Sequence, residues 1–213
     1  MESDLEIIKH GCYKGTRILM GNHKAHYLEF ARHFLRQRGF DEIHVPIIQP
    51  TSIFQDKVGK ENNNLMYTFK DRGERDLCLA PEYTAVIQGL SQTHFKNHED
   101  VLLFYIQECF RGEKPQAGRY RQFTQLGVEI LNPSIDHTEM VVTMAEDLLY
   151  LWKGNKVLFT TTRGVGRGLD YYTEGKGFEI QCGSLGSSKQ VVGGGEYEGG
   201  IGFAIGVDRL ILT

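Results

Sequence analysis

The sequence predicts an α+β fold in which an antiparallel β-sheet is flanked by helices. Strand-like segments follow one another with short turns between them, which favours antiparallel pairing. The regular alternation of strands and helices that a doubly wound parallel sheet requires is absent. The chain has 213 residues, 40% of them hydrophobic and 24% charged, which is ordinary for a globular protein. We therefore expect a single domain over residues 1–213.

Two kinds of hydrophobic periodicity locate the elements. Apolar residues from Ala25 to Leu35 recur at helical spacing, whereas Ile43 and Val45 alternate with polar neighbours as in a strand. Pro46 lacks an N–H, so that strand should lie at a sheet edge or an interface. The expected elements are a helix over 23–38, a strand over 43–47, a hairpin of strands 66–69 and 77–80, a helix from 82 to about 95, strands over 102–107 and 121–131, a helix over 137–152, strands over 157–162, 177–182 and 189–192, and a final apolar run from 201.

Composition excludes several classes of protein. No apolar run approaches the roughly 20 residues that span a bilayer, and the N-terminus lacks the pattern of a signal peptide. The four cysteines are far apart without a CxxC pair, which predicts free thiols in a reducing cytoplasm and no zinc site. A net charge of −3 makes the chain a poor autonomous nucleic-acid binder.

The segment 110–123 carries the clearest chemical pattern. It reads as two strand ends joined by a glycine-containing loop, with arginines at 111, 119 and 121, a glutamate at 113 and a phenylalanine at 123. Guanidinium groups bind phosphate oxygens in a bidentate manner. A phenylalanine ring offers a face on which a base can stack, and a carboxylate can accept from an exocyclic amine. The segment therefore predicts a nucleotide site, with ATP as the expected ligand.

Further stretches accompany this segment in a fixed order. They are residues 39–50 with Val45-Pro46, residues 167–173 reading Arg-Gly-Leu-Asp-Tyr-Tyr-Thr, residues 194–199 reading Gly-Gly-Glu-Tyr-Glu-Gly, and residues 202–210 reading Gly-Phe-Ala-Ile-Gly-Val-Asp-Arg-Leu. Together they resemble the motifs of class II aminoacyl-tRNA synthetases, in the form found in histidyl-tRNA synthetase. Motif 1 would span about 39–50, motif 2 about 108–131, the histidine signature 167–173 and motif 3 about 201–213.

This resemblance implies a class II synthetase-like catalytic domain that converts histidine and ATP into histidyl-adenylate and pyrophosphate. It also implies a homodimer formed through motif 1, and ATP accompanied by Mg²⁺ held mainly by phosphates. Arg111 and Arg167 would be catalytic and would contact the α-phosphate, where charge grows during in-line attack. The ATP contacts implied are Arg111, Glu113, Arg119, Phe123 and Arg209. Arg121 could equally be a solvated strand residue.

The amino-acid site is implied in the same way. Glu129 lies in a mostly apolar strand, where an idle charge would be costly, and it would recognise imidazole together with Tyr172. The ammonium group would be held by Glu82, Thr84 and Gln125. The amino-acid contacts implied are Glu82, Thr84, Gln125, Glu129, Arg167, Tyr171 and Tyr172. We expect no metal site, because His94 and His98, although spaced by four, have no evident third ligand.

The sequence also departs from the family pattern. The family has Arg-Pro-Glu-Gly-Thr where this chain has Ala80-Pro81-Glu82-Tyr83-Thr84, which predicts altered ammonium binding. The interval from Glu129 to Arg167 is too short for the family's helical insertion, and the chain stops at Thr213, before any anticodon-binding domain. We therefore expect activation of the amino acid rather than tRNA charging by this chain alone.

Two alternatives remain open at this stage. A paralogue of the synthetase serves as a regulatory subunit of ATP-phosphoribosyltransferase, although such a subunit has no need of ATP-binding arginines. An adenylating paralogue could instead use another amino acid or load an acceptor other than tRNA. Ala80 and Tyr83 motivate this second alternative.

Overall fold

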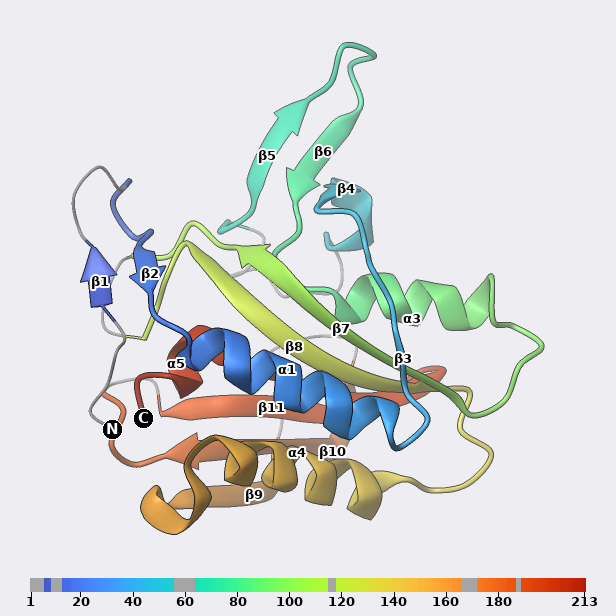
Figure 1. The fold of residues 1–213 in the computed structure, drawn as a ribbon. Helices are drawn as coiled ribbons and strands as arrows, with labels where there is room; N and C mark the ends of the chain where they lie inside the picture. The colour runs from blue at the N-terminus through green and yellow to red at the C-terminus, as the bar shows by residue number, and fades with distance from the viewer. Residues whose placement is uncertain (1–5, 9–12, 56–63, 115–117, 166–171, 187–188) are drawn as a thin grey trace.

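A seven-stranded sheet forms the centre of the molecule in the computed structural model, which describes residues 6–8, 13–55, 64–114, 118–165, 172–186 and 189–213. In sheet order the strands are β3 (Asp41–Glu42), β7 (Val101–Phe110), β8 (Gln122–Leu131), β12 (Gly200–Gly206), β11 (Gln190–Tyr197), β10 (Tyr172–Cys182) and β9 (Phe159–Val165). All neighbouring strands are antiparallel except β3 and β7. The predicted α+β fold, an antiparallel sheet flanked by helices, is thereby confirmed (Figure 1).

Helices α1 (His23–Arg36) and α4 (Thr138–Lys153) cover one face of this sheet (Figure 1). Tyr27, Ala31 and Leu35 lie four residues apart on α1, so they share one helix face, and all three are buried. They pack in one apolar cluster with alternate residues of β8, from Leu126 to Ile130. Burial of this helical stripe against the sheet explains why the predicted helices form.

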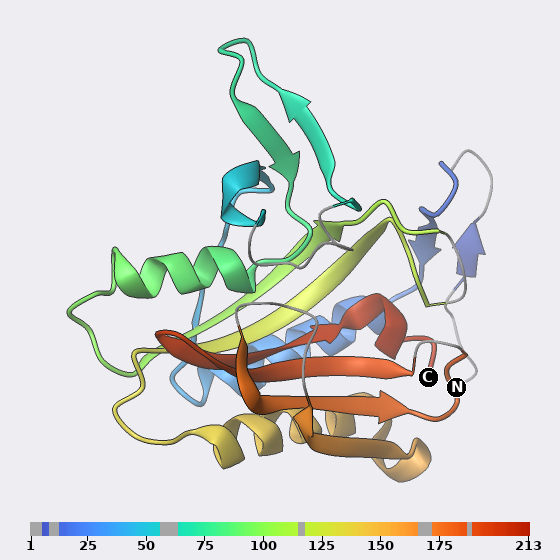
Figure 2. The same ribbon diagram turned by 180° about the vertical axis from the view of Figure 1, so that it is seen from behind.

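The opposite face carries helix α3 (Thr84–Gln92) and a smaller sheet in the order β4 (Ile48–Pro50), β6 (Asp76–Leu79), β5 (Tyr67–Lys70). Figure 2 shows the β5–β6 hairpin projecting away from the large sheet. A second apolar cluster, which includes Tyr83, Ile87 and Tyr105, lies on this side. The remaining elements are β1 (Glu6–Ile8), β2 (Ile18–Met20), the 3₁₀ helices η1 (Thr51–Ile53) and η2 (Gly154–Lys156), and α5 (Val207–Leu210).

The predicted strand over 43–47 is wrong. Residues 43–46 have no regular structure and residue 47 is a bend, between β3 and β4. Pro46 cannot donate to a ladder, and the Gln107 side chain replaces a strand partner for Val45. The Gln107 amide accepts from the Val45 N–H at 3.0 Å and donates to the Val45 carbonyl at 2.9 Å. A side-chain amide therefore satisfies backbone groups that a neighbouring strand would otherwise bind.

The other predicted elements are confirmed, with shifted ends. The helix expected to run from 82 to about 95 spans only Thr84–Gln92, so His94 and His98 follow the helix instead of sharing one of its faces. The strand expected at 189–192 continues to Tyr197. After α3, the ring of Phe95 contacts the rings of His94 and His98 edge-on.

The cysteines within the described residues are free thiols, as the sequence predicts. Cys78, Cys109 and Cys182 are free and buried, and Cys12 lies outside the described residues. Burial raises the pKa of Cys78 to about 11, which keeps that thiol protonated at neutral pH. In the described part of the chain, no helix has the length and apolar character needed to cross a membrane.

Candidate active site

The predicted site residues of β8 lie on the sheet face opposite α1 and α4. Side chains alternate along a strand, so Phe123, Gln125 and Glu129 share one face while Thr124 and Leu126 point to the other. The structure bears this out, because Phe123 packs with the second apolar cluster and Glu129 contacts α3. The strand therefore divides its chemistry-bearing residues from its core residues.

Gly202 of β12 makes room for the Glu129 carboxyl group, and Gly195 of β11 allows a close approach of β10. Gly202 pairs with Glu129 across the β12–β8 ladder. A Cβ atom at Gly202 would lie 1.9 Å from Glu129 Oε2 and 2.4 Å from the main-chain oxygen of Val128. A Cβ atom at Gly195 would approach the Gly177 Cα to 2.9 Å. Any larger residue at Gly202 would therefore displace the carboxyl group or the strand.

Arginine side chains hold the loop between β7 and β8 by donating to main-chain carbonyl groups. Arg111 Nε donates to the Pro81 carbonyl at 2.8 Å, and Arg121 Nε donates to the Glu113 carbonyl at 3.1 Å. Arg119 Nη1 lies 3.5 Å from Glu113 Oε2. Arg121, for which a solvated strand role remained open, is half-buried just before β8 and holds the loop in shape.

Three guanidinium groups converge in this region. Arg209, in α5, donates from Nε to the Gly118 carbonyl at 2.9 Å and from Nη1 to the Gln190 carbonyl at 2.6 Å. Burial lowers the pKa of Arg209, and the charges of Arg119 and Arg111 lower it further, while Glu113 opposes the shift. Like charges held this close favour a ligand with several negative charges, such as a polyphosphate.

Phe123 borders the same region. Its ring is half-buried on β8, and the Arg111 guanidinium lies 5.2 Å from the ring centroid, within cation–π range. An aromatic face next to converging arginines suits a base joined to phosphates. Stacking of adenine on Phe123 stays a prediction.

Glu129 is fully buried and has two hydroxyl partners. Thr84 Oγ1 donates to one carboxyl oxygen at 2.9 Å, and the Tyr197 hydroxyl donates to the other at 2.8 Å. Burial raises the pKa of Glu129 to about 8; the two hydroxyl groups oppose this rise, and the charge of Glu82 adds to it. A buried acid that resists ionisation is suited to a cationic partner, which would stabilise its charged form.

The remaining residues expected to bind the amino acid surround Glu129. The Glu82 carboxylate is 3% exposed and accepts from the Ala85 N–H at 3.1 Å at the start of α3. Gln125 Oε1 accepts from the Tyr105 hydroxyl at 3.4 Å and from the Cys109 thiol at 3.3 Å. The structure therefore brings Glu82, Gln125 and Glu129 to one side of the sheet.

Tyr83, which replaces the family's glycine, belongs to the core. Its ring is fully buried, lies 5.4 Å from the Tyr105 ring, and its hydroxyl donates to the Glu108 carbonyl at 2.9 Å. Ala80, which replaces the arginine, is also fully buried. The substitution thus adds apolar contacts beside the site, and its effect on ammonium binding stays a prediction.

Sequence reasoning missed two tyrosines. The hydroxyl that donates to Glu129 belongs to Tyr197, whose ring lies 6.4 Å from that of Tyr172, the residue expected to recognise imidazole. Tyr105, the other one missed, rests against Gly127 and reaches Gln125. The available signals were a tyrosine at the end of the glycine-rich strand β11 and a tyrosine opposite a glycine of the neighbouring strand. Arg167 and Tyr171, also expected in the site, lie outside the described residues.

The residues that the structure describes contain no group of three or more histidine, cysteine, aspartate or glutamate side chains arranged to hold a metal. The loop carboxylate nearest the arginines is Glu113, which Arg119 already pairs. Mg²⁺ bound to phosphate oxygens would be compatible with this side-chain set, since such ions usually keep few protein ligands.

A comparison with protein-family models matches residues 22–156, more than half of the chain, to the histidyl-tRNA synthetase model. The chain belongs to the histidyl-tRNA synthetase family. A histidine–tRNA ligase from Desulfitobacterium hafniense is 39% identical over 149 residues, covering 65% of this chain and 34% of the ligase. One from Pelotomaculum thermopropionicum is 28% identical over 308 residues, covering 94% of this chain and 72% of that protein. The match to the first of these relatives spans about a third of its length.

Solved structures agree with the family. Apo histidyl-tRNA synthetase of Staphylococcus aureus superposes with a TM-score of 0.72 at 25% identity, covering 94% of this chain and 69% of that one. A protein from Bacillus halodurans, described as an ATP phosphoribosyltransferase regulatory subunit/histidyl-tRNA synthetase, superposes with a TM-score of 0.74 over 96% of this chain and 83% of that one. At 13% identity the latter shows the fold alone. The fold is thus that of a class II histidyl-tRNA synthetase-like catalytic domain.

Proposed function

We propose that this chain activates histidine with ATP, forming histidyl-adenylate and releasing pyrophosphate. The observation that carries the proposal is the contact of Arg209 with the loop that carries Arg119, where the charges of Arg119 and Arg111 act on it, together with the buried Glu129 on β8. The arginines suit a triphosphate, and the buried acid suits a cationic or N–H-bearing side chain. Membership of the histidyl-tRNA synthetase family supports histidine as that amino acid.

The proposed chemistry is an in-line displacement at the α-phosphorus. A carboxylate oxygen of histidine forms the new P–O bond, the bond to the bridging oxygen breaks, and pyrophosphate leaves with its electrons. Arg111, held by the Pro81 carbonyl, would stabilise the charge that grows on the α-phosphate. Arg119 and Arg209 would bind the outer phosphates, with Mg²⁺ neutralising part of their charge. Arg167 would be a second arginine at the α-phosphate by family resemblance.

Glu129 would select the amino acid. Its carboxylate would accept from an imidazole N–H, with Tyr197 holding the other carboxyl oxygen. A site built from hydrogen-bonding groups rejects amino acids that leave those groups unpaired. Glu82, Thr84 and Gln125 would hold the ammonium group. Tyr172 would serve the second imidazole nitrogen, and Tyr171 follows by resemblance.

The wider setting is part of the same proposal. Residues 1–213 would form one catalytic domain with its motifs near 39–50, 108–131, 167–173 and 201–213. The domain would be cytoplasmic and would pair with a second copy through motif 1. Transfer to tRNA stays a weaker expectation than activation, and another acceptor or amino acid is the alternative that buried Ala80 and Tyr83 keep open. A regulatory role in ATP-phosphoribosyltransferase would leave the converging arginines without a purpose.

Exchange of labelled pyrophosphate into ATP, measured over a panel of amino acids, tests the proposal. We expect exchange that depends on histidine and is weak with the other amino acids. Exchange with a different amino acid would replace histidine as substrate. Absence of exchange with every amino acid at high enzyme concentration would contradict the proposed activity.

A further inference from the structure

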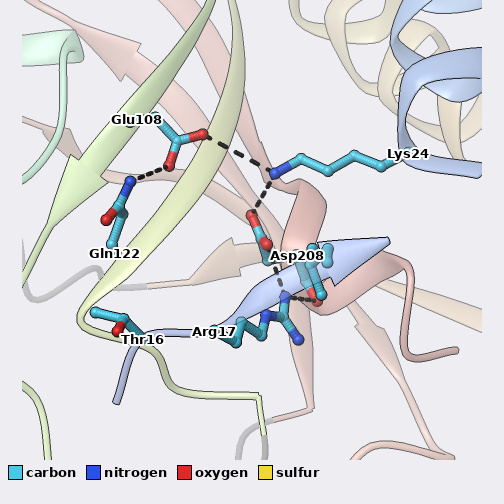
Figure 3. Close-up of a pocket in the computed structure, with 7 residues that line it drawn as sticks. Thr16, Arg17, Lys24, Glu108, Gln122 and Asp208 are labelled. Carbon is cyan, nitrogen blue, oxygen red and sulfur yellow. Dashed lines mark hydrogen bonds and ion pairs between the residues drawn. The ribbon is translucent and has the colours of Figure 1, made fainter. Parts of the chain in front are cut away.

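A second polar cluster lies on the side of the sheet that α1 covers, and Figure 3 shows the side chains of Arg17 and Lys24 meeting Asp208 there. It borders a hollow of about 290 Å³ lined by Thr16, Arg17, Leu19, Lys24, Glu108, Gln122 and Asp208. Thr124 joins it from β8, because its hydroxyl binds both Lys24 and Glu108. We call Arg17, Lys24, Glu108, Thr124 and Asp208 the rear cluster. It connects the N-terminal segment, α1, β7, β8 and α5.

Asp208 is the centre of the rear cluster. Its side chain is 6% exposed and accepts from the Thr124 N–H at 2.5 Å and from Arg17 Nη2 at 2.6 Å. Lys24 Nζ lies 3.4 Å from the other side of this carboxylate. The same Arg17 nitrogen also donates to the Asp208 carbonyl at 3.1 Å. The start of α5 is therefore held to β8 and to the N-terminal segment by charge-assisted hydrogen bonds.

Arg17 extends this connection to the loop between β7 and β8. Its guanidinium carbon lies 3.6 Å from the centroid of the Tyr120 ring, and the Arg17 side chain is only 7% exposed. The backbone adds a bond from the Arg121 N–H to the Gly15 carbonyl at 2.8 Å. The N-terminal segment thus binds both the loop that carries Arg119 and the helix that carries Arg209.

Members and contacts of the rear cluster adjoin ATP-site residues along the chain. Asp208 precedes Arg209, Thr124 follows Phe123, and Tyr120 follows Arg119. On β8, adjacent side chains point to opposite faces, so the bonds of Thr124 on one face set the position of Phe123 on the other. Asp208 and Arg209 are neighbours in the short helix α5, so bonds that hold Asp208 also hold the backbone of Arg209. The rear cluster therefore links the backbone segments that carry the arginines and the aromatic ring of the proposed ATP site.

The energetics argue that this cluster does more than stabilise the fold. Within the described structure, Arg17 Nε and Nη1 are buried without a hydrogen-bond partner. Burying charges is costly, and apolar residues of similar size often stabilise a core as well as a buried ion pair does. What a network of fixed charges adds is a defined geometry between the elements that it joins.

We propose that the rear cluster, with Asp208 at its centre, positions Arg209 against Phe123 and Arg119 for binding ATP. This inference rests on the proposed function only in that ATP is the ligand. Asp208, Arg17 and Lys24 are positioning residues, since they act on the nucleotide through Arg209.

Calorimetric titration with Mg-ATP in the absence of histidine tests this proposal separately from the activity. Asp208→Asn removes the charge and keeps the size, and we expect it to raise the Kd for ATP about tenfold, as small misplacements of binding groups do. In an Arg209→Ala background the same change should alter the Kd by less than about twofold, because the positioned group is gone. Equal losses in both backgrounds would overturn the proposal.

Two further variants keep the test decisive. Lys24→Met is the second variant, to be used if Asp208→Asn fails to fold, because the Lys24 side chain is 24% exposed. It should also raise the Kd for ATP. Asp100→Asn is the matched control, because Asp100 precedes the first residue of β7, at the opposite end of that strand from Glu108. Its carboxylate accepts from the Ser134 N–H at 2.8 Å and from the Ser134 hydroxyl at 2.5 Å. The control should leave the Kd for ATP within about twofold of wild type.

The remaining outcomes are also informative. An unchanged ATP affinity in both Asp208→Asn and Lys24→Met, with both proteins folded, would overturn the positioning role. Wild-type protein that binds ATP without histidine-dependent exchange would contradict the proposed function and leave the positioning role testable by the same titration. Wild-type protein that binds no ATP would overturn both.

Discussion

At the scale of single residues, Glu129 is the most informative side chain. Strand alternation directs it out of the apolar core, and the glycine at 202 gives its carboxyl group space across the next strand. Two hydroxyl groups fix both of its oxygens, yet burial keeps its pKa near 8. Below a pH of about 8, the Glu129 carboxyl group is therefore mainly protonated. A bound cation would favour its ionised form.

This shift predicts a pH-dependent stability. The pKa of Glu129 in the folded protein lies above its ordinary value of 4.5. Its contribution to the free energy of unfolding is therefore at its full value below about pH 4.5 and is lost as the pH rises toward 8. The free energy of unfolding should then fall as pH rises toward about 8, by on the order of 3–5 kcal/mol in total from this group. Glu129→Gln should flatten this part of the profile. Urea unfolding of both proteins between pH 5 and 9 measures it, and identical slopes would contradict the assignment.

Tyr197 gives a second prediction at this scale. Tyr197→Phe removes the hydroxyl that donates to Glu129 and leaves the ring in the core. Losing one hydrogen bond to a charged acceptor should raise the KM for histidine about tenfold. The KM for ATP should stay near that of wild type, because Tyr197 is not among the residues proposed to bind ATP. A parallel rise in both constants would show that the tyrosine supports the fold instead of the amino-acid site.

At the scale of elements, the glycines of β11 and β12 explain how buried site groups fit between strands. Gly202 tolerates no Cβ, because that atom would overlap Glu129 and the Val128 carbonyl. In contrast, Gly89 within α3 has no atom within 4 Å of the position that its Cβ would occupy. The two glycines therefore serve different purposes in neighbouring elements.

Alanine substitution distinguishes them. Gly202→Ala should destabilise the protein by more than about 2 kcal/mol, since backbone atoms must move. Gly89→Ala should stabilise it by about 0.5–1 kcal/mol, because alanine is the better helix former. Thermal unfolding of the two variants provides the measurement. A neutral Gly202→Ala would refute the close packing of β12 on Glu129.

The elements also show what the sequence could and could not predict. Local periodicity predicted the helices α1 and α4 and the strands β7 and β8, because each depends on its own apolar pattern. It failed at residues 43–47, where alternation looked like a strand but the partner of Val45 is the Gln107 side chain. A side chain that replaces a strand leaves no trace in a local pattern.

At the scale of the whole molecule, both faces of the sheet are packed by apolar clusters, and the proposed site lies on one of them. One face packs on α1 and α4 in the apolar core, and the other carries the arginines, Phe123 and Glu129. The ordered motifs predicted the class of fold, and they are the reason for proposing Arg111, Arg119 and Arg209 as parts of one site. They could not predict Tyr197 as the partner of Glu129 or the bonds of Asp208 to Arg17, because these join residues remote in sequence.

The central claim is that this chain forms histidyl-adenylate. Its most direct measurement is single-turnover conversion of α-labelled ATP in the presence of histidine and pyrophosphatase, with the adenylate detected on the enzyme. We expect labelled histidyl-adenylate bound to wild-type protein, and a rate at least about 100-fold lower in Arg111→Ala, which lacks the guanidinium proposed to stabilise the α-phosphate. Labelled ATP that is bound but remains unconverted with histidine, in folded wild-type protein, would contradict it.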